Sequence, residues 1–202
     1  MIKIFFKNKN QGFTLVETLV AISIFTISIL ALLAVLTQGV TSTYYARQKI
    51  VASYLAQEGI EYMRNMRDTF VLYDITLPNP AQHGWDAFNS KIAPSPGALC
   101  ASENGCYFDD RNVIFNKTAM PITDLILTAC TSSTCANGAL NYNSATGRYN
   151  YDVSGVNSGF TRQIKITQIS LNETKISSTV YWTQGSGAYS ISFSESLYNW
   201  IE

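Results

Sequence analysis

One stretch of the sequence limits the fold more than any other. Residues 19–36 (LVAISIFTISILALLAVL) are 18 residues without a charged side chain. A helix of this length can cross the hydrocarbon core of a bilayer, which is about 30 Å thick. A helix in a soluble core alternates apolar and polar positions at the helical period, whereas this run is apolar all round. It therefore predicts a membrane-spanning helix, in which three hydroxyls can hydrogen-bond back to their own helix: Ser23, Thr26 and Ser28.

A secretory signal peptide is the main alternative for this run. Signal peptides have a similar basic start, but their apolar part is only about 7–15 residues long and precedes a cleavage site of small residues. The length of the run argues against that alternative. Three lysines precede Gly12, whereas Arg47 and Lys49 follow the run. By the positive-inside rule the N-terminus faces the cytoplasm, and everything after about Val40 lies outside.

One acidic residue stands next to the apolar run. Glu17 lies two residues before it, where a charge is costly unless it finds a partner or reaches water at the interface. The surrounding residues, Gly12-Phe13-Thr14-Leu15-Val16-Glu17, follow a short basic leader. This combination resembles the signature of type IV prepilins: a basic leader, a glycine, a phenylalanine, a glutamate four residues on and an apolar helix.

The resemblance implies how the N-terminus is processed. In this family a membrane aspartyl peptidase, the prepilin peptidase, cuts after the glycine, here between Gly12 and Phe13, and methylates the new amine of Phe13. The cut lies on the cytoplasmic side of the apolar run, so the anchor survives. A glycine before the bond fits because its backbone can enter a protease cleft in an extended form.

The resemblance also gives Glu17 a partner. In this family the glutamate pairs with the terminal amine of a neighbouring subunit during assembly, and low dielectric strengthens such an ion pair. The implied partners are therefore the prepilin peptidase, other pilin or pseudopilin subunits and the cytoplasmic membrane. The alternative for Glu17 is an interfacial carboxylate that reaches water.

The helix is expected to continue beyond the membrane. The first proline is Pro78, so one helix can run from Phe13 to about Arg67, which is roughly 80 Å at 1.5 Å per residue. Beyond the membrane, side chains at spacings of seven and four residues share one face, together with Gln48 and Gly59. This face is predicted to carry the head, and its members are Tyr44, Val51, Leu55, Tyr62 and Met66.

The last third of the chain predicts an antiparallel meander. Three β-prone runs, 160–171, 175–183 and 188–198, are joined by short polar or glycine-containing segments. They supply an apolar face for the helix: Phe160, Ile164, Ile166, Ile169, Ile176, Val180, Trp182, Ile191, Phe193 and Leu197. Shorter strands are predicted at 106–108, 113–115, 124–128, 141–142 and 148–152.

The predicted fold class is α+β and pilin-like. A long N-terminal helix, transmembrane in its first half, packs by its second half on an antiparallel β-sheet. Four of the five prolines fall between positions 77 and 96, which favours a loop there. The expected parts are a prepilin leader (1–12), a transmembrane and assembly half-helix (13–40), a soluble half-helix (41–68), a connecting loop (69–98) and an antiparallel β head (99–202).

Four cysteines lie in the predicted head: Cys100, Cys106, Cys130 and Cys135. The head is expected outside the cytoplasm, where disulfides persist, so we expect these cysteines to be paired. Three connectivities are open, and the local one, Cys100 with Cys106 and Cys130 with Cys135, closes two small turns. Structural zinc motifs favour two to four residues between cysteines; the gaps here are five, which exceeds that range, and four, which is its upper limit, so a zinc site is not expected.

The sequence shows no catalytic signature. His83 is the only histidine, and it lies in the proline-rich stretch with no nucleophile motif around a serine or cysteine. Asp109, Asp110 and Asn112 could offer oxygens to calcium, but no acidic ladder follows them. Fourteen basic residues balance fourteen acidic ones, which is untypical of nucleic-acid binders. We expect no enzyme, metal, cofactor, nucleic acid or small-molecule substrate.

The predicted function is that of a structural subunit of a type IV pilus, acting in adhesion or motility. Many major pilins have a proline inside the apolar segment and this chain has none, which favours a minor pilin or a pseudopilin over a major subunit. Residues 56–68 are similar to the juncture of minor pilins related to the type IV pilus modification protein. The alternatives are a pseudopilin of a type II secretion or DNA-uptake machine, and an unassembled single-pass membrane enzyme or receptor that keeps its leader.

The expected location follows from the anchor and the resemblance together. The protein first lies in the cytoplasmic membrane as a single-pass protein, with its leader in the cytoplasm and its head outside. After assembly it is expected in a pilus at the cell surface, or in the periplasm.

Overall fold

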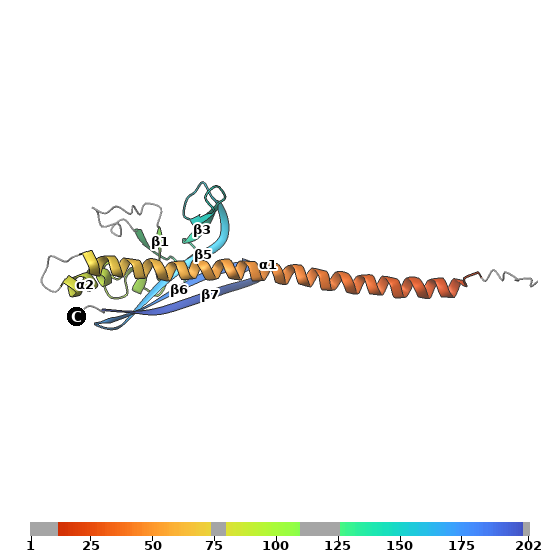
Figure 1. Ribbon diagram of the computed structural model, residues 1–202, viewed down its shortest axis with the longest axis horizontal. Helices are drawn as coiled ribbons and strands as arrows, with labels where there is room; N and C mark the ends of the chain where they lie inside the picture. The colour runs from red at the N-terminus through yellow and green to blue at the C-terminus, as the bar shows by residue number, and fades with distance from the viewer. Residues whose placement is uncertain (1–11, 74–79, 110–125, 200–202) are drawn as a thin grey trace, which may run out of the picture. The chain divides into compact units, whose positions relative to one another are not determined.

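The computed structural model describes residues 12–73, 80–109 and 126–199, in two compact units that meet between Ala46 and Arg47. Helix α1 (Leu15–Tyr73) begins in the first unit and ends in the second (Figure 1). The second unit also contains α2 (Pro80–Ile92), the 3-10 helix η1 (Leu99–Ala101), β1 (Cys106–Asp109), β2 (Ile126–Ala129), β3 (Ala139–Asn143), β4 (Arg148–Asn150), β5 (Val156–Ser170), β6 (Glu173–Gln184) and β7 (Gly187–Tyr198). The predicted α+β class is confirmed.

In the first unit, α1 is apolar and exposed on all sides. Every side chain from Phe13 to Tyr44 is exposed. The hydroxyls predicted to bond within the helix do so: Ser23, Thr26 and Ser28 donate to backbone carbonyls three or four residues earlier, at 2.8–2.9 Å. Because these hydroxyls are satisfied internally, the helix presents an apolar surface to its surroundings. It is the one helix in the described part of the chain that is long and apolar enough to cross a membrane.

The strands of the second unit join one antiparallel sheet in which β5 is central. One side of β5 pairs with β6, and the other pairs with β1 and β3. Beyond these, β7 pairs with β6, β2 with β1, and β4 with β3. The predicted meander of β5, β6 and β7 is confirmed. The prediction at 113–115 and the first part of that at 124–128 lie outside the described residues.

The second half of α1 packs on one face of this sheet. Its buried positions recur every three or four residues, as an amphipathic helix requires: Ala52, Leu55, Ala56, Gly59, Ile60, Met63, Met66 and Phe70. At Gly59 a Cβ atom would lie against Ser178 Oγ and 3.0 Å from Ile164 Cδ1, so a glycine allows helix and sheet to approach closely. The predicted stripe is correct at Leu55 and Met66. It is wrong at Tyr44, which is 52% exposed and belongs to the first unit.

The predicted connecting loop at residues 69–98 is wrong, because much of it is helical. Helix α1 continues to Tyr73, and Pro80 begins α2. Proline suits the first position of a helix, where its fixed φ is pre-organised and its missing N–H is not needed. The prolines therefore mark a helix start as well as a loop. Three side chains bury α2 against the core, namely Trp85, Phe88 and Ile92, and the indole N–H of Trp85 donates to the carbonyl of Leu171 at 2.7 Å.

The apolar face of the meander differs from the prediction at two positions. Ile169 is 55% exposed, because it lies an odd number of residues after Ile166 and successive side chains of a strand alternate between faces. The ladder also shifts register between Gln168 and Ser170. Arg162, which the prediction passed over, occupies the buried face and is 1% exposed.

Arg162 links the sheet to the helix. Its Nη1 donates to the Glu58 carboxylate of α1 at 2.6 Å and to the carbonyl of Leu55 at 3.4 Å. Its guanidinium lies 4.0 Å from the centre of the Phe108 ring, a distance typical of a cation–π contact. Glu58 is partly exposed and supplies the carboxylate that compensates this buried charge.

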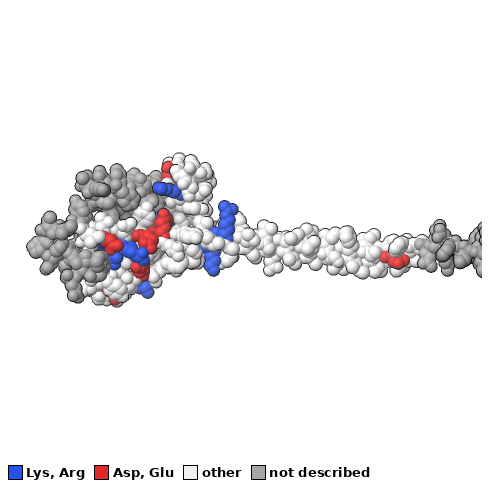
Figure 2. Space-filling model, in the orientation of Figure 1, with Lys and Arg blue, Asp and Glu red and all other residues white. Residues whose placement is uncertain are grey.

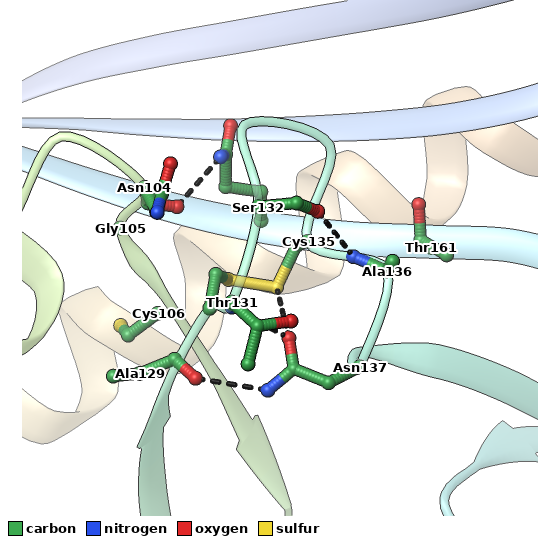
Figure 3. The surroundings of a disulfide bond; sticks show 12 residues. Asn104, Gly105, Cys106, Ala129, Thr131, Ser132, Cys135, Ala136, Asn137 and Thr161 are labelled. Atoms are coloured by element: carbon green, nitrogen blue, oxygen red, sulfur yellow. Dashed lines mark hydrogen bonds between the residues drawn. A yellow bond between two sulfur atoms is a disulfide. The ribbon is translucent and has the colours of Figure 1, made fainter.

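Two disulfides close local turns, Cys100–Cys106 between η1 and β1 and Cys130–Cys135 between β2 and β3. Figure 3 shows the second one, with Asn137 beside it. The Asn137 amide donates to the carbonyl of Ala129 at 2.9 Å and accepts from the N–H of Thr131 at 3.0 Å, so the loop is tied at both ends. Because all four sulfurs are bonded in pairs, none is a thiolate ligand for zinc.

We expect Gly84→Ala to destabilise the head by about 2 kcal/mol, a typical cost of overpacking. A Cβ at Gly84 would collide with the carbonyl oxygen of Phe70 and lie 2.6 Å from the Cα of Val71, and backbone atoms cannot rotate away. Thermal unfolding of the full chain in detergent, followed by near-UV circular dichroism, measures the loss. Gly39→Ala is the matched control, since nothing lies within 4 Å of its Cβ. Equal midpoints for the two variants would contradict the packing described.

We expect Glu58→Ala to destabilise the head by about 2 kcal/mol, because it leaves the buried Arg162 guanidinium without its carboxylate. The double variant Glu58→Leu with Arg162→Met should be more stable than Glu58→Ala, since it removes both charges together. Chemical unfolding of the three proteins measures the order. A double variant less stable than Glu58→Ala would show that the buried charge is not the source of the loss.

Candidate assembly site at the start of the first helix

The site predicted from the sequence lies where α1 begins. Gly12 and Phe13 precede the helix without regular secondary structure, and Phe13 is 78% exposed. The hydroxyl of Thr14 accepts from the N–H of Glu17 at 3.3 Å, and the carbonyl of Thr14 accepts from the N–H of Thr18 at 3.2 Å. Thr14 is therefore the N-cap of α1, and Glu17 is its third helical residue.

The sequence reasoning missed this cap. Thr14-Leu15-Val16-Glu17 fits the capping-box pattern, a threonine followed three residues later by a glutamate before an apolar run. This pattern predicts an N-cap at Thr14 from the sequence alone. It gives Glu17 a position in the first turn, where the helix dipole favours a negative charge.

The Glu17 carboxylate is open to a partner from outside the chain. It is exposed, and within residues 12–73, 80–109 and 126–199 no cation lies in ion-pair distance of it. The contact with Thr14 uses the backbone N–H of Glu17 and leaves both carboxylate oxygens available. A cationic group brought by another molecule could therefore bind there without breaking the cap.

The surroundings of Glu17 are apolar. Between Phe13 and Ala46 it is the one charged residue, and Figure 2 shows the first unit white apart from one acidic group. Large apolar side chains on all sides are exposed, for example Leu15, Phe25 and Leu33 at 79%, 66% and 52%. Because such a surface is unfavourable in water, lipid or other apolar helices must cover it.

Cleavage between Gly12 and Phe13 would create an amine close to this carboxylate. Phe13 and Glu17 are four residues apart, which is about one helical turn, or roughly 6 Å along the axis. Amine and carboxylate would then lie at the same end of an apolar helix. Two such helices staggered by about one turn could pair the amine of one with the carboxylate of the other.

Comparison with known families identifies the motif at this end of the chain. Residues 7–33 match the family model described as the prokaryotic N-terminal methylation motif. The chain carries the type IV prepilin-like signature. No curated protein and no solved structure matches the chain.

The prepilin-like signature indicates a type IV pilin-like or pseudopilin-like protein, and this family is structural. Together with the apolar half of α1 it indicates membrane anchoring. It also implies processing by a prepilin peptidase and assembly with other pilins. The matched segment ends at residue 33, so the signature describes the anchor and not the head.

The other candidate residues do not come together. His83 is exposed on α2, and the half-buried Asp109 ends β1. Asp110 and Asn112, the other candidate calcium ligands, lie outside the described residues. Where the structure describes the chain, no three His, Cys, Asp or Glu side chains are grouped so that they could hold a metal ion.

We expect Thr14→Ala to fray the first turn of α1, because the N–H of Glu17 loses the hydroxyl that accepts its hydrogen bond. Loss of an N-cap costs about 1 kcal/mol. Amide hydrogen exchange of the full chain in lipid nanodiscs should show faster exchange at residues 15–18 and no change in the head. Thr14→Ser keeps a hydroxyl and is the matched control. Unchanged exchange in Thr14→Ala would exclude Thr14 as the cap.

Proposed function

We propose that the chain is a structural subunit, a minor pilin, of a type IV pilus. A prepilin peptidase cuts between Gly12 and Phe13 and methylates the Phe13 amine, and the subunit then assembles through α1. The observation that carries the proposal is the prepilin-like signature at residues 7–33 on a helix whose apolar side chains are exposed all round. A helix of this kind is suited to lipid before assembly and to other apolar helices after it.

Glu17 supplies the specific attraction in this proposal. Its carboxylate would pair with the Phe13 amine of a neighbouring subunit inside an apolar helix bundle. A lone carboxylate there is costly, and an ion pair between two such groups is stronger than in water. The pair therefore favours the one stagger of two helices that brings amine and carboxylate together. Apolar contacts alone would allow many staggers.

Three observations support the location and the finer role. Two disulfides in the second unit suit a compartment outside the cytoplasm, where such bonds persist. The basic leader before Gly12 favours an N-terminus in the cytoplasm. The apolar segment has no proline and α1 is continuous through it, unlike the proline-containing segment of many major pilins, which supports a minor subunit. In this role the protein has no catalytic function.

Glu17→Ala tests the proposal in the native cell. We expect the variant to be cut and methylated like the wild type but to fall about tenfold in sheared filaments, because a tenfold loss corresponds to only about 1.4 kcal/mol of lost attraction. Immunoblots of sheared and envelope fractions measure the distribution, and mass spectrometry measures the processing. The matched control is Glu103→Ala, which removes an exposed carboxylate from the head.

Three outcomes would contradict the proposal. If Glu17→Ala reached filaments in wild-type amounts, the ion pair would have no role in assembly. A wild-type protein that stays with the envelope on shearing would be a pseudopilin. A wild-type protein that keeps its leader would be an unassembled membrane protein.

A further inference from the structure

Strand β7 is a long edge of the sheet. It pairs with β6 over all of its twelve residues, from Gly187 to Tyr198, and among the described residues no strand pairs with its other side. The other outer strands, β2 and β4, are short, with four and three residues. A long unpaired edge presents a row of backbone N–H and C=O groups that can accept a further strand.

The register fixes which residues face outward. Gln184 and Gly187 flank a two-residue turn, so they form a hydrogen-bonded pair, and such pairs alternate along an antiparallel ladder. The odd-numbered residues from 189 to 197 therefore bond to β6, and the even-numbered ones direct their backbone groups away from it. The β7 edge is defined here by four of these outward residues: Ser190, Ser192, Ser194 and Ser196.

The β7 edge lacks most of the features that commonly protect edge strands. Natural proteins blunt such edges with prolines, lysines, bulges or very short strands. β7 contains no proline, lysine or arginine, and its ladder with β6 runs without a register shift. Its one charged residue, Glu195, is held by Arg64 of α1 at 2.5 Å. As far as the described residues extend, the edge is thus long, regular and open to pairing.

A groove of about 460 Å³ adjoins this edge on the side of α1. Its apolar walls include Tyr54, which is 69% exposed, and the half-buried Phe193. In its polar part Arg64 contacts two carboxylates, Glu61 at 2.7 Å and Glu195. The hydrogen bond with Glu195 raises the pKa of the Arg64 guanidinium, which therefore stays charged. Two carboxylates share one guanidinium, so the cluster has a net negative charge that suits a further cation.

A second copy fits this edge poorly. Two copies joined through β7 about a two-fold axis would run the second halves of their α1 helices in opposite directions. Subunits that are anchored in one membrane and assemble side by side share one direction along their helices, which this pairing does not give. Within the described residues, a copy in the same orientation offers β2 or β4, whose four or three residues make a short ladder.

We propose that the β7 edge is a docking site for an extended segment of a different protein subunit, which adds as a strand beside Ser190–Ser196. Alternate side chains of that segment lie under α1, where apolar ones contact Tyr54 and Phe193 and a basic one lies near Glu61 and Glu195. Backbone hydrogen bonds provide the affinity and the groove provides the selection. The proposal deepens the proposed function, on which it rests only in placing the partner in the same filament.

The test uses the full chain in lipid nanodiscs and a fluorescein-labelled synthetic peptide, SVTVSKSVTV, which alternates apolar and small polar residues and has a central lysine. Fluorescence anisotropy should show saturable binding, with empty nanodiscs as the background. Ser192→Pro removes an outward N–H while leaving the ladder to β6, because Ser192 does not donate to β6. We expect about tenfold weaker binding to this variant, and wild-type binding to Ser192→Ala.

A second variant and a second peptide keep the test decisive if Ser192→Pro does not fold. Ser194→Lys leaves the backbone intact but places a charge on the edge, and should also weaken binding. The peptide with glutamate in place of lysine should bind less well than the original. Three results would overturn the proposal: no saturable binding to the wild type, equal binding to the wild type and both edge variants, or a dimer in the nanodiscs that Ser192→Pro dissociates. N-terminal processing is measured separately, so a failure of the proposed function is distinguishable.

Discussion

The apolar surface of the first half of α1 is the constraint on which the rest of the molecule depends. The side chains from Phe13 to Tyr44 are exposed, most of them are apolar, and the described residues of the chain do not cover them. Water is an unfavourable environment for such a helix, so its cover must come from lipid or from other helices. Within that surface Glu17 is the one charge. Apolar contacts alone would let two such helices associate at many staggers. A single charge in the apolar surface favours the stagger that brings it next to an opposite charge on the neighbouring helix.

The second half of the same helix meets a different requirement. It keeps an apolar stripe on one side only, and the sheet covers that stripe at close range around Gly59. The buried Arg162 adds a directional contact, since its guanidinium finds Glu58 on the helix and the Phe108 ring on the sheet. One continuous helix thus combines a surface for an external apolar environment with a surface for its own head. Among the described residues, the outer strand β7 leaves a long unpaired edge, next to a groove that α1 and β7 line together.

The sequence predicted the features that depend on strong local patterns. The uncharged run, the prepilin-like signature and the three β-prone runs were each readable because composition or fixed spacing carries them. Positions that depend on tertiary contacts were not predicted. Arg162 was not predicted on the buried face, because its contacts with Glu58 and Phe108 exist only in the folded chain. Ile169 was predicted on the wrong face, because the assignment followed its hydrophobicity and not the alternation of side chains along the strand. The loop predicted around Pro80 was wrong because a proline can begin a helix as well as interrupt one. The cap at Thr14 was readable from the sequence and was missed.

The intact mass and N-terminal residue of the protein extracted from its native membranes test the central claim most directly. The account predicts a chain that begins at Phe13 with a methylated amine and retains the whole apolar helix. That result would place a charged amine one helical turn from Glu17, as assembly through this helix requires. A chain that still begins at Met1, or one cut beyond Leu36, would contradict the account, since either the amine or the anchor would be missing.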